Sequence, residues 1–86
     1  MYQKDIVVRC ASGLHNKQVA YFVQKANEFK SNIWLESENR KMNAKSLLGI
    51  VSLGIVTDAP VTLIANGPDE EEAVAALELL LQRDVY

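Results

Sequence analysis

The chain contains a single histidine, His15, in a setting that suits the transfer of a phosphoryl group. It follows Gly13 and Leu14 and comes just before an amphipathic segment that predicts a helix. The first backbone N–H groups of a helix have no partner within it, and together with the helix dipole they attract anions. Lys17 adds a positive charge nearby, and neutral imidazole has a lone pair for nucleophilic attack. Taken alone, these residues favour an ordinary surface histidine at a helix start, with a phosphoryl acceptor as the alternative.

Ser46 is the second residue with a candidate chemical role. A serine that directly precedes a short helix usually caps it, and Gly54 suits the other end. The apolar residues between them cannot all face inward on one short helix, so some form an exposed patch of the kind that marks partner surfaces. These residues are Leu47, Leu48, Ile50, Val51 and Leu53. A phosphate on Ser46, beside Lys45, would bring a charge of about −1.5 to −2 to this patch without unfolding the helix.

The composition limits the remaining possibilities. The length of 86 residues and the 49% share of hydrophobic residues predict one domain with a buried core over residues 1–86. The net charge of −2 argues against a main task in binding nucleic acid or anionic membrane. Basic residues gather between residues 15 and 45 and acidic residues after residue 58, a distribution for which a solvated surface is the favoured explanation.

Several classes of site find no support in the sequence. Cys10 is the one cysteine, so an internal disulfide framework is excluded, and one cysteine with one histidine cannot form a structural zinc site. No paired carboxylates, Gly-rich phosphate loop or Ser/His/Asp set stands out, so we expect neither a cofactor nor a metal. The polar first residues and the lack of an apolar run of about 20 residues predict a reduced, cytoplasmic protein without membrane insertion.

Hydrophobic periodicity predicts the element order β-α-β-β-α-β-α, an α/β two-layer sandwich with helices over one sheet face. The expected strands cover residues 5–11, 32–37, about 41–43, and 60–66. Within the second strand Ile33 and Leu35 point inward and Trp34 lies on the opposite face. The expected first and last helices bury two stripes, namely Val19, Phe22, Val23 and Ala26, and Ala73, Leu77, Leu80 and Leu81. Asp69 and Glu72 predict a capping-box pair at the start of the last helix.

Two motifs carry a resemblance to a known family: Gly13-Leu14-His15 and the run from Ala44 to Gly54. Over essentially its whole length the sequence resembles HPr, the histidine-containing phosphocarrier of the bacterial phosphoenolpyruvate-dependent sugar phosphotransferase system, and its regulatory relative Crh. The serine motif is similar to the form found in Gram-positive bacteria. The resemblance implies an HPr-like α/β (α+β) fold with an antiparallel four-stranded sheet and three helices on one face.

The resemblance also implies a role for the histidine. His15 would take phosphate from enzyme I and pass it to enzyme IIA domains, with Lys17 as the phosphate contact. Such a protein is a phosphoryl-transfer intermediary rather than an enzyme with its own turnover. The family pattern continues from the histidine with a small residue, an arginine and a proline, where this chain has Asn16, Lys17 and Gln18. Lysine offers a point charge in place of the planar fork of arginine, and glutamine restores the N–H that proline lacks.

The serine motif implies regulation. By the resemblance, the HPr kinase/phosphorylase modifies Ser46, and a partner surface includes Leu47, Leu48, Val51 and Gln18. Crh lacks the phosphorylatable histidine and, like Ser-phosphorylated HPr, acts as a co-repressor by binding the transcription regulator CcpA. We therefore expect a phosphocarrier with regulatory phosphorylation at Ser46. The alternative is a Crh-like regulator of catabolite repression with weak or no carrier activity.

Overall fold

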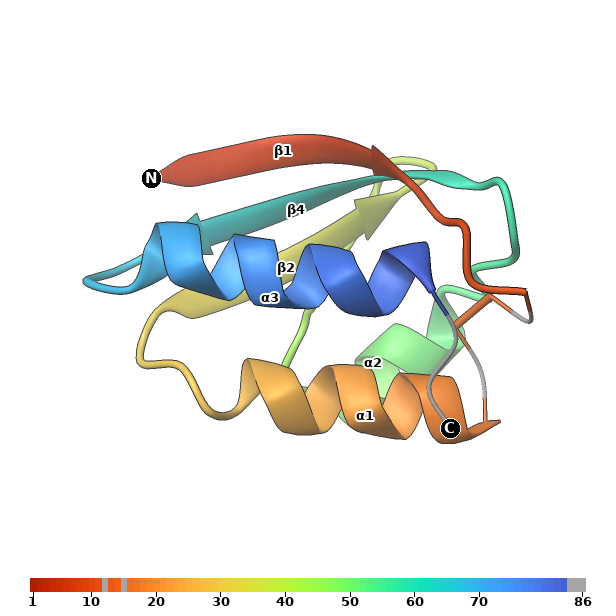
Figure 1. The fold of residues 1–86 in the computed structure, drawn as a ribbon, viewed down its shortest axis with the longest axis horizontal. Helices are drawn as coiled ribbons and strands as arrows, with labels where there is room; N and C mark the ends of the chain where they lie inside the picture. The colour runs from red at the N-terminus through yellow and green to blue at the C-terminus, as the bar shows by residue number, and fades with distance from the viewer. Residues whose placement is uncertain (12, 15, 84–86) are drawn as a thin grey trace.

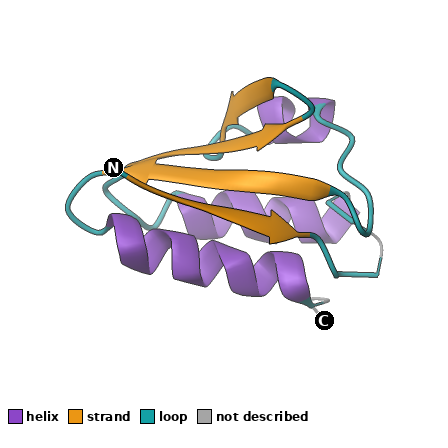
Figure 2. Cartoon of the chain, turned by 90° about the horizontal axis from the view of Figure 1, so that it is seen from above, coloured by secondary structure: helices purple, strands orange, loops and turns teal. Residues whose placement is uncertain are grey.

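A computed structural model describes residues 1–11, 13–14 and 16–83 of the chain. Its elements, in chain order, are β1 (Tyr2–Val7), α1 (Asn16–Ala26), β2 (Asn32–Ser37), β3 (Arg40–Asn43), α2 (Leu47–Ser52), β4 (Pro60–Asn66) and α3 (Glu70–Gln82). The strands form one antiparallel sheet in the order β1-β4-β2-β3. α3 packs on β1 and β4, α1 packs beside α3, and α2 lies between α1 and β3 (Figure 1, Figure 2). The predicted order and the two-layer fold are confirmed.

The core lies between the sheet and the helices, as the periodicity predicts. Ile33 pairs with Ala65 and Leu35 with Leu63 across β2 and β4, and these side chains are buried. The predicted stripes of α1 and α3 meet them, with Val23 and Leu80 partly buried at the margin. Ile50 of α2 is buried in the same core, so the three helices cover the same face of the sheet.

β1 both begins and ends earlier in the chain than the predicted range 5–11. It runs from Tyr2 to Val7, because the chain then turns away from the sheet toward the end of α3. The backbone N–H groups of Arg9 and Cys10 both donate to the carbonyl oxygen of Leu81, at 2.7 and 3.1 Å. Cys10 is buried as its alternation predicts, but in a loop rather than a strand.

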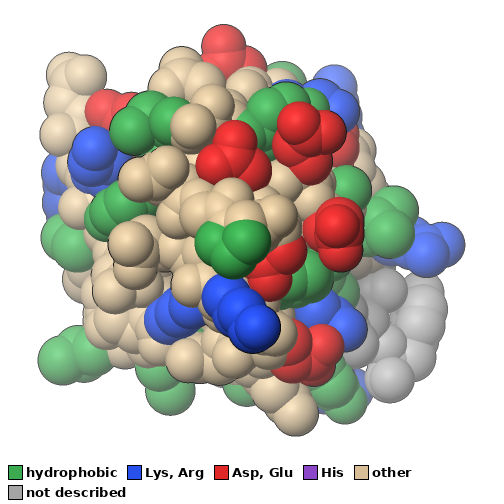
Figure 3. Space-filling view, turned by 90° about the vertical axis from the view of Figure 1, so that its left-hand side faces the viewer, with side chains coloured by type: hydrophobic (Ala, Val, Ile, Leu, Met, Phe, Trp, Pro, Cys, Tyr) green, Lys and Arg blue, Asp and Glu red, His purple; other side chains and the backbone are tan. Residues whose placement is uncertain are grey.

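The surface carries mixed charge. Figure 3 shows the end of the molecule where α3 begins, with acidic side chains close to lysine and arginine side chains. Ion pairs join Lys4 to Glu78 at 2.8 Å and the amino group of Met1 to Glu70 at 3.4 Å. Such solvent-exposed pairs contribute about 0–1 kcal/mol each. This arrangement agrees with the solvated surface favoured by the sequence.

The predicted capping box at the start of α3 is wrong for both of its carboxylates, Asp69 and Glu72. Asp69 occupies the capping position, but its side chain makes no capping hydrogen bond to the helix. Glu70, rather than Glu72, is the carboxylate that reaches back, because its Oε1 accepts from the N–H of Gly67 at 3.0 Å. The sequence pattern identified the start of the helix but assigned the wrong partners to its carboxylates.

Asp69 instead joins α3 to the connection between α1 and β2. Its carboxylate accepts hydrogen bonds from the hydroxyl of Ser31 and from the backbone N–H groups of Lys30 and Ser31, the last two at 2.9 and 3.0 Å. These bonds, with that from the Ser31 hydroxyl the largest cause, lower the pKa of Asp69 to about 2. A carboxylate that accepts several hydrogen bonds is stabilised in its charged form.

We expect the stability of the protein to fall as the pH drops from about 4 to about 2. The pKa of an unfolded aspartate is about 3.9, so the folded state binds fewer protons here, and the stabilisation by Asp69 is complete above that value and lost as the pH falls through the folded pKa. Asp69→Asn should lower the free energy of unfolding at pH 7 and flatten this part of its pH profile. Urea unfolding between pH 2 and pH 7 measures both effects.

The control is Glu71→Gln, which removes an exposed carboxylate from the first turn of the same helix. This variant should lose less stability at pH 7 than Asp69→Asn. An acid profile of Asp69→Asn that matches the unmodified protein would show that the bonds to Lys30 and Ser31 do not stabilise the fold.

Candidate functional site

The predicted phosphoacceptor His15 lies outside the described residues, so the site is built from its neighbours in the chain. Leu14 is buried, as predicted for an anchor, and its N–H donates to the carbonyl oxygen of Ile55 at 2.9 Å. Gly13 has a φ of +70°, and a Cβ there would lie 2.5 Å from that same carbonyl oxygen. Only glycine fits both the backbone angle and the space. The backbone at Gly13 and Leu14 is therefore held against Ile55.

The start of α1 suits an anion. The helix spans 11 residues from Asn16 and has no acidic residue in its first turn. Its unpaired N–H groups and its dipole favour negative charge at this end. Lys17 is exposed in the first turn and adds a positive charge. Its contact with a phosphate group stays a prediction.

Gln18 was predicted for the partner surface, and its contact with a partner stays a prediction, but its side chain is largely buried. Its side chain is 7% exposed, and Nε2 donates to the carbonyl oxygens of Leu80 and Arg83 near the end of α3. The last carbonyl groups of a helix lack partners within it, and Gln18 supplies a donor for that of Leu80 and for that of Arg83, which directly follows the helix. Gln18 thus joins the first turn of α1 to the end of α3. No local pattern in the sequence indicates this contact, because the partners lie 62 and 65 residues apart.

Ser46 occupies the predicted capping position of α2. Its Oγ accepts from the N–H of Gly49 at 3.1 Å, and the residue is exposed. The next residues form an exposed apolar surface, which we call the apolar patch: Leu47, Leu48 and Val51, at 51%, 81% and 50% exposure. Patches of this kind mark protein–protein contacts. The prediction that some apolar side chains of this segment are exposed is confirmed, and the contact of Leu47, Leu48 and Val51 with a partner stays a prediction.

Lys45, next to Ser46 in the chain, has a structural contact of its own. Its Nζ donates to the carbonyl oxygen of Phe29 at 2.7 Å, beyond the end of α1. The side chain of Asn27 donates back to the carbonyl oxygen of Lys45 at 3.3 Å. These bonds fix the approach to α2 against α1, and one N–H of the Lys45 ammonium is directed to a carbonyl group.

We also searched the described residues for a metal site, a reactive cysteine and a membrane-spanning helix. Across residues 1–11, 13–14 and 16–83, no three His, Cys, Asp or Glu side chains gather in a way that could hold a metal ion. Cys10 is buried, with its Sγ 3.4 Å from the carbonyl oxygen of Gly13. None of the helices in the described part of the chain is long and apolar enough to cross a membrane.

Comparison with known proteins shows the family to which the chain belongs. The family model described as "PTS HPr component phosphorylation site" matches residues 2–83. The chain is 45% identical over 85 residues to "HPr-like protein Crh" of Bacillus subtilis (strain 168), covering 99% of this chain and 100% of that protein. It is 40% identical over 81 residues to "Phosphocarrier protein HPr" of Buchnera aphidicola subsp. Schizaphis graminum, covering 94% of this chain and 95% of that protein.

The structural likeness agrees. The fold matches the crystal structure of HPr-C-His from Thermoanaerobacter tengcongensis with a TM-score of 0.92 and 46% identity, covering 95% of this chain and 92% of that chain. The class is therefore that of HPr-type sandwiches, in which a four-stranded antiparallel sheet carries three helices. The chain belongs to the HPr/Crh family of phosphocarrier proteins, as its two motifs predicted.

We expect Gln18→Leu to lower the free energy of unfolding by about 1–3 kcal/mol, because partly buried carbonyl groups of α3 lose their donor. Gln24→Leu is the matched control, since Gln24 is exposed on the same helix. A surface change of that kind alters stability by less than about 0.5 kcal/mol. Urea unfolding at pH 7 measures both variants. Equal losses would show that the Gln18 amide does not hold the two helices together.

Proposed function

We propose that the protein is a phosphocarrier of the phosphoenolpyruvate-dependent sugar phosphotransferase system, accepting phosphate on His15 from enzyme I and passing it to enzyme IIA domains. The observation that carries the proposal is the retention of His15 directly before α1. Membership of the HPr/Crh family supports it. These partners place the proposed activity in the cytoplasm.

The chemistry follows from the start of α1. A neutral imidazole nitrogen attacks phosphorus, and a P–N bond forms as the bond to the donor breaks. The negative charge on the three phosphoryl oxygens is stabilised by the N-terminal amides of α1, in a turn that has no acidic residue. Lys17 adds a point charge to the same end of the helix. Transfer to the next acceptor reverses these steps and regenerates the neutral ring.

Incubation with phosphoenolpyruvate and enzyme I should yield an acid-labile phosphate that is absent from His15→Ala. Lys17→Ala should slow this transfer about tenfold, because a charge-assisted contact to the phosphate is lost. Lys25→Ala is the control, since it removes the same charge from the last turn of the same helix. Label on the unmodified protein no higher than on His15→Ala would refute the carrier function.

A second candidate function, a Crh-like regulator, is favoured by the apolar patch beside an exposed Ser46. In this proposal the HPr kinase/phosphorylase phosphorylates Ser46, and the phosphorylated protein binds the transcription regulator CcpA through Leu47, Leu48 and Val51. The relative named "HPr-like protein Crh" supports it. The two functions use different residues and can belong to one protein.

The kinase should add an acid-stable phosphate that Ser46→Ala cannot accept, and binding to CcpA should rise with phosphorylation. Leu48→Ala should weaken the binding of the phosphorylated protein about tenfold, since Leu48 is the most exposed member of the apolar patch. Leu79→Ala is the matched control, an exposed leucine on α3. If Ser46→Ala binds as tightly as the phosphorylated protein, the regulatory role is wrong.

A further inference from the structure

The loop that leads from β1 to His15 is held by groups from two distant segments. We call it the histidine loop; it covers residues 8–14, of which 8–11 and 13–14 are described. From α3, the carbonyl oxygen of Leu81 accepts from the N–H groups of Arg9 and Cys10. From the connection between α2 and β4, Ile55 and Thr57 contact the part of the loop nearest to His15. The geometry of the loop therefore depends on both segments.

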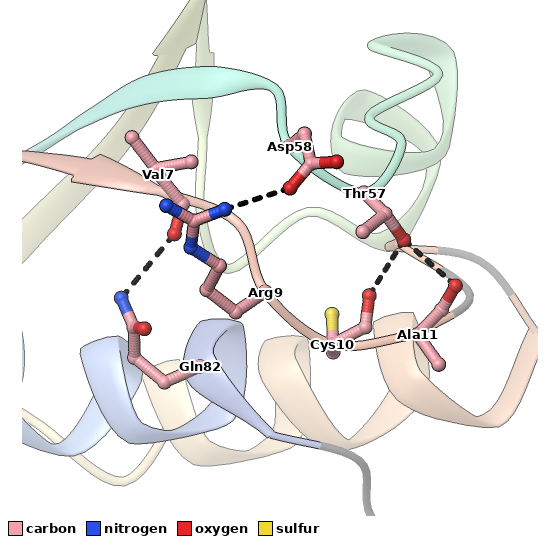
Figure 4. Close-up of polar contacts among 7 residues, drawn as sticks. All are labelled: Val7, Arg9, Cys10, Ala11, Thr57, Asp58 and Gln82. Carbon is pink, nitrogen blue, oxygen red and sulfur yellow. Dashed lines mark hydrogen bonds and ion pairs between the residues drawn. The ribbon is translucent and has the colours of Figure 1, made fainter.

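Thr57 contributes an unusual contact to this loop. Its Oγ1 lies 2.7 Å from the carbonyl oxygen of Cys10 and 2.7 Å from that of Ala11, so one hydroxyl proton is directed at two successive carbonyl groups (Figure 4). Both carbonyl groups can face one donor because the backbone turns here. The N–H of Gly13 donates to the same Cys10 carbonyl at 3.1 Å and closes the turn. Thr57 thus binds the inside of the turn that precedes Leu14 and His15.

Two neighbouring side-chain contacts are less suited to holding this turn in place. Arg9 and Asp58 form an ion pair at 2.8 Å, but their side chains are 57% and 71% exposed (Figure 4). Exposed pairs are screened by water and contribute little. Gln82 donates to the carbonyl oxygen of Val7 at 3.3 Å, before the turn begins. Thr57 is half-buried and contacts the turn itself, so of these three side chains it is the donor best placed to fix the turn.

We propose that Thr57 is a positioning residue for the phosphoacceptor, acting through the histidine loop. The inference rests on the proposed carrier function. The turn closed by Thr57 continues into Leu14, whose N–H is bonded to Ile55, and the next residue is His15. Efficient transfer needs the nucleophile and the anion-binding amides in a fixed relation, and small displacements reduce the rate. Thr57 contributes by limiting the movement of the chain that carries the imidazole.

The test compares Thr57→Val, which keeps the shape and removes the hydroxyl, with Thr57→Ser, which keeps the hydroxyl. Thr62→Val is the matched control, because it removes a threonine hydroxyl that donates to Asp5 within the sheet. Phosphate transfer from enzyme I should slow about three- to tenfold in Thr57→Val, the range expected for one hydrogen bond. The change should appear in kcat with KM unaltered, since Thr57 does not touch the partner in this proposal. Thr57→Ser should restore the rate.

A second measurement does not depend on transfer. Amide hydrogen exchange of Gly13 and Leu14 should be faster in Thr57→Val than in the unmodified protein, Thr57→Ser and Thr62→Val, because the turn opens more often. Unchanged exchange in Thr57→Val overturns the proposal, as does faster exchange together with an unchanged kcat. If the unmodified protein accepts no phosphate on His15, the carrier function fails, and the positioning of an acceptor by Thr57 fails with it. Exchange then shows separately whether Thr57 holds the loop.

Discussion

The end of α3 is the constraint on which the rest of the site depends. The last carbonyl groups of a helix have no donors within it, and here segments on both sides of His15 supply them. The carbonyl oxygen of Leu81 accepts from Arg9 and Cys10, ahead of His15 in the chain. The carbonyl oxygens of Leu80 and Arg83 accept from Gln18, just after it. The helix end that needs donors therefore also fixes the two segments that flank His15 in the chain.

The serine site rests on different contacts. Lys45 and Asn27 join the approach to α2 to the end of α1, and Ser46 caps α2 with its own hydroxyl. None of these bonds involves the end of α3 or the histidine loop. Because the two sets share no hydrogen-bonding group, a change at Ser46 need not alter the histidine loop. Two sites held by separate contacts are physically compatible with one domain of this size.

Local patterns predicted most of this fold, and distant contacts decided the rest. The alternation in β2 and the stripes of α1 and α3 depend only on neighbouring residues, so the sequence shows them directly. The bond from Gln18 to Leu80 and those from Lys30 and Ser31 to Asp69 join residues far apart in the chain. A side-chain amide or carboxylate at a helix start has many allowed partners, and periodicity does not choose among them. For the same reason β1 ends before the predicted position, where Leu81 offers an acceptor.

Lys17 and Gln18 depart from the family pattern, and they change how the first turn of α1 is held in place. A proline restricts the first turn of a helix by its ring, which fixes φ without help from the rest of the molecule. Gln18 restricts the same turn by hydrogen bonds to α3, so the restriction exists only while the two helices are packed together. Lys17 supplies charge without the planar fork of arginine, which leaves more of the positioning to the backbone. In this chain the segments before and after His15 are therefore held by tertiary contacts, from α3 through Gln18 and from the α2–β4 connection through Thr57.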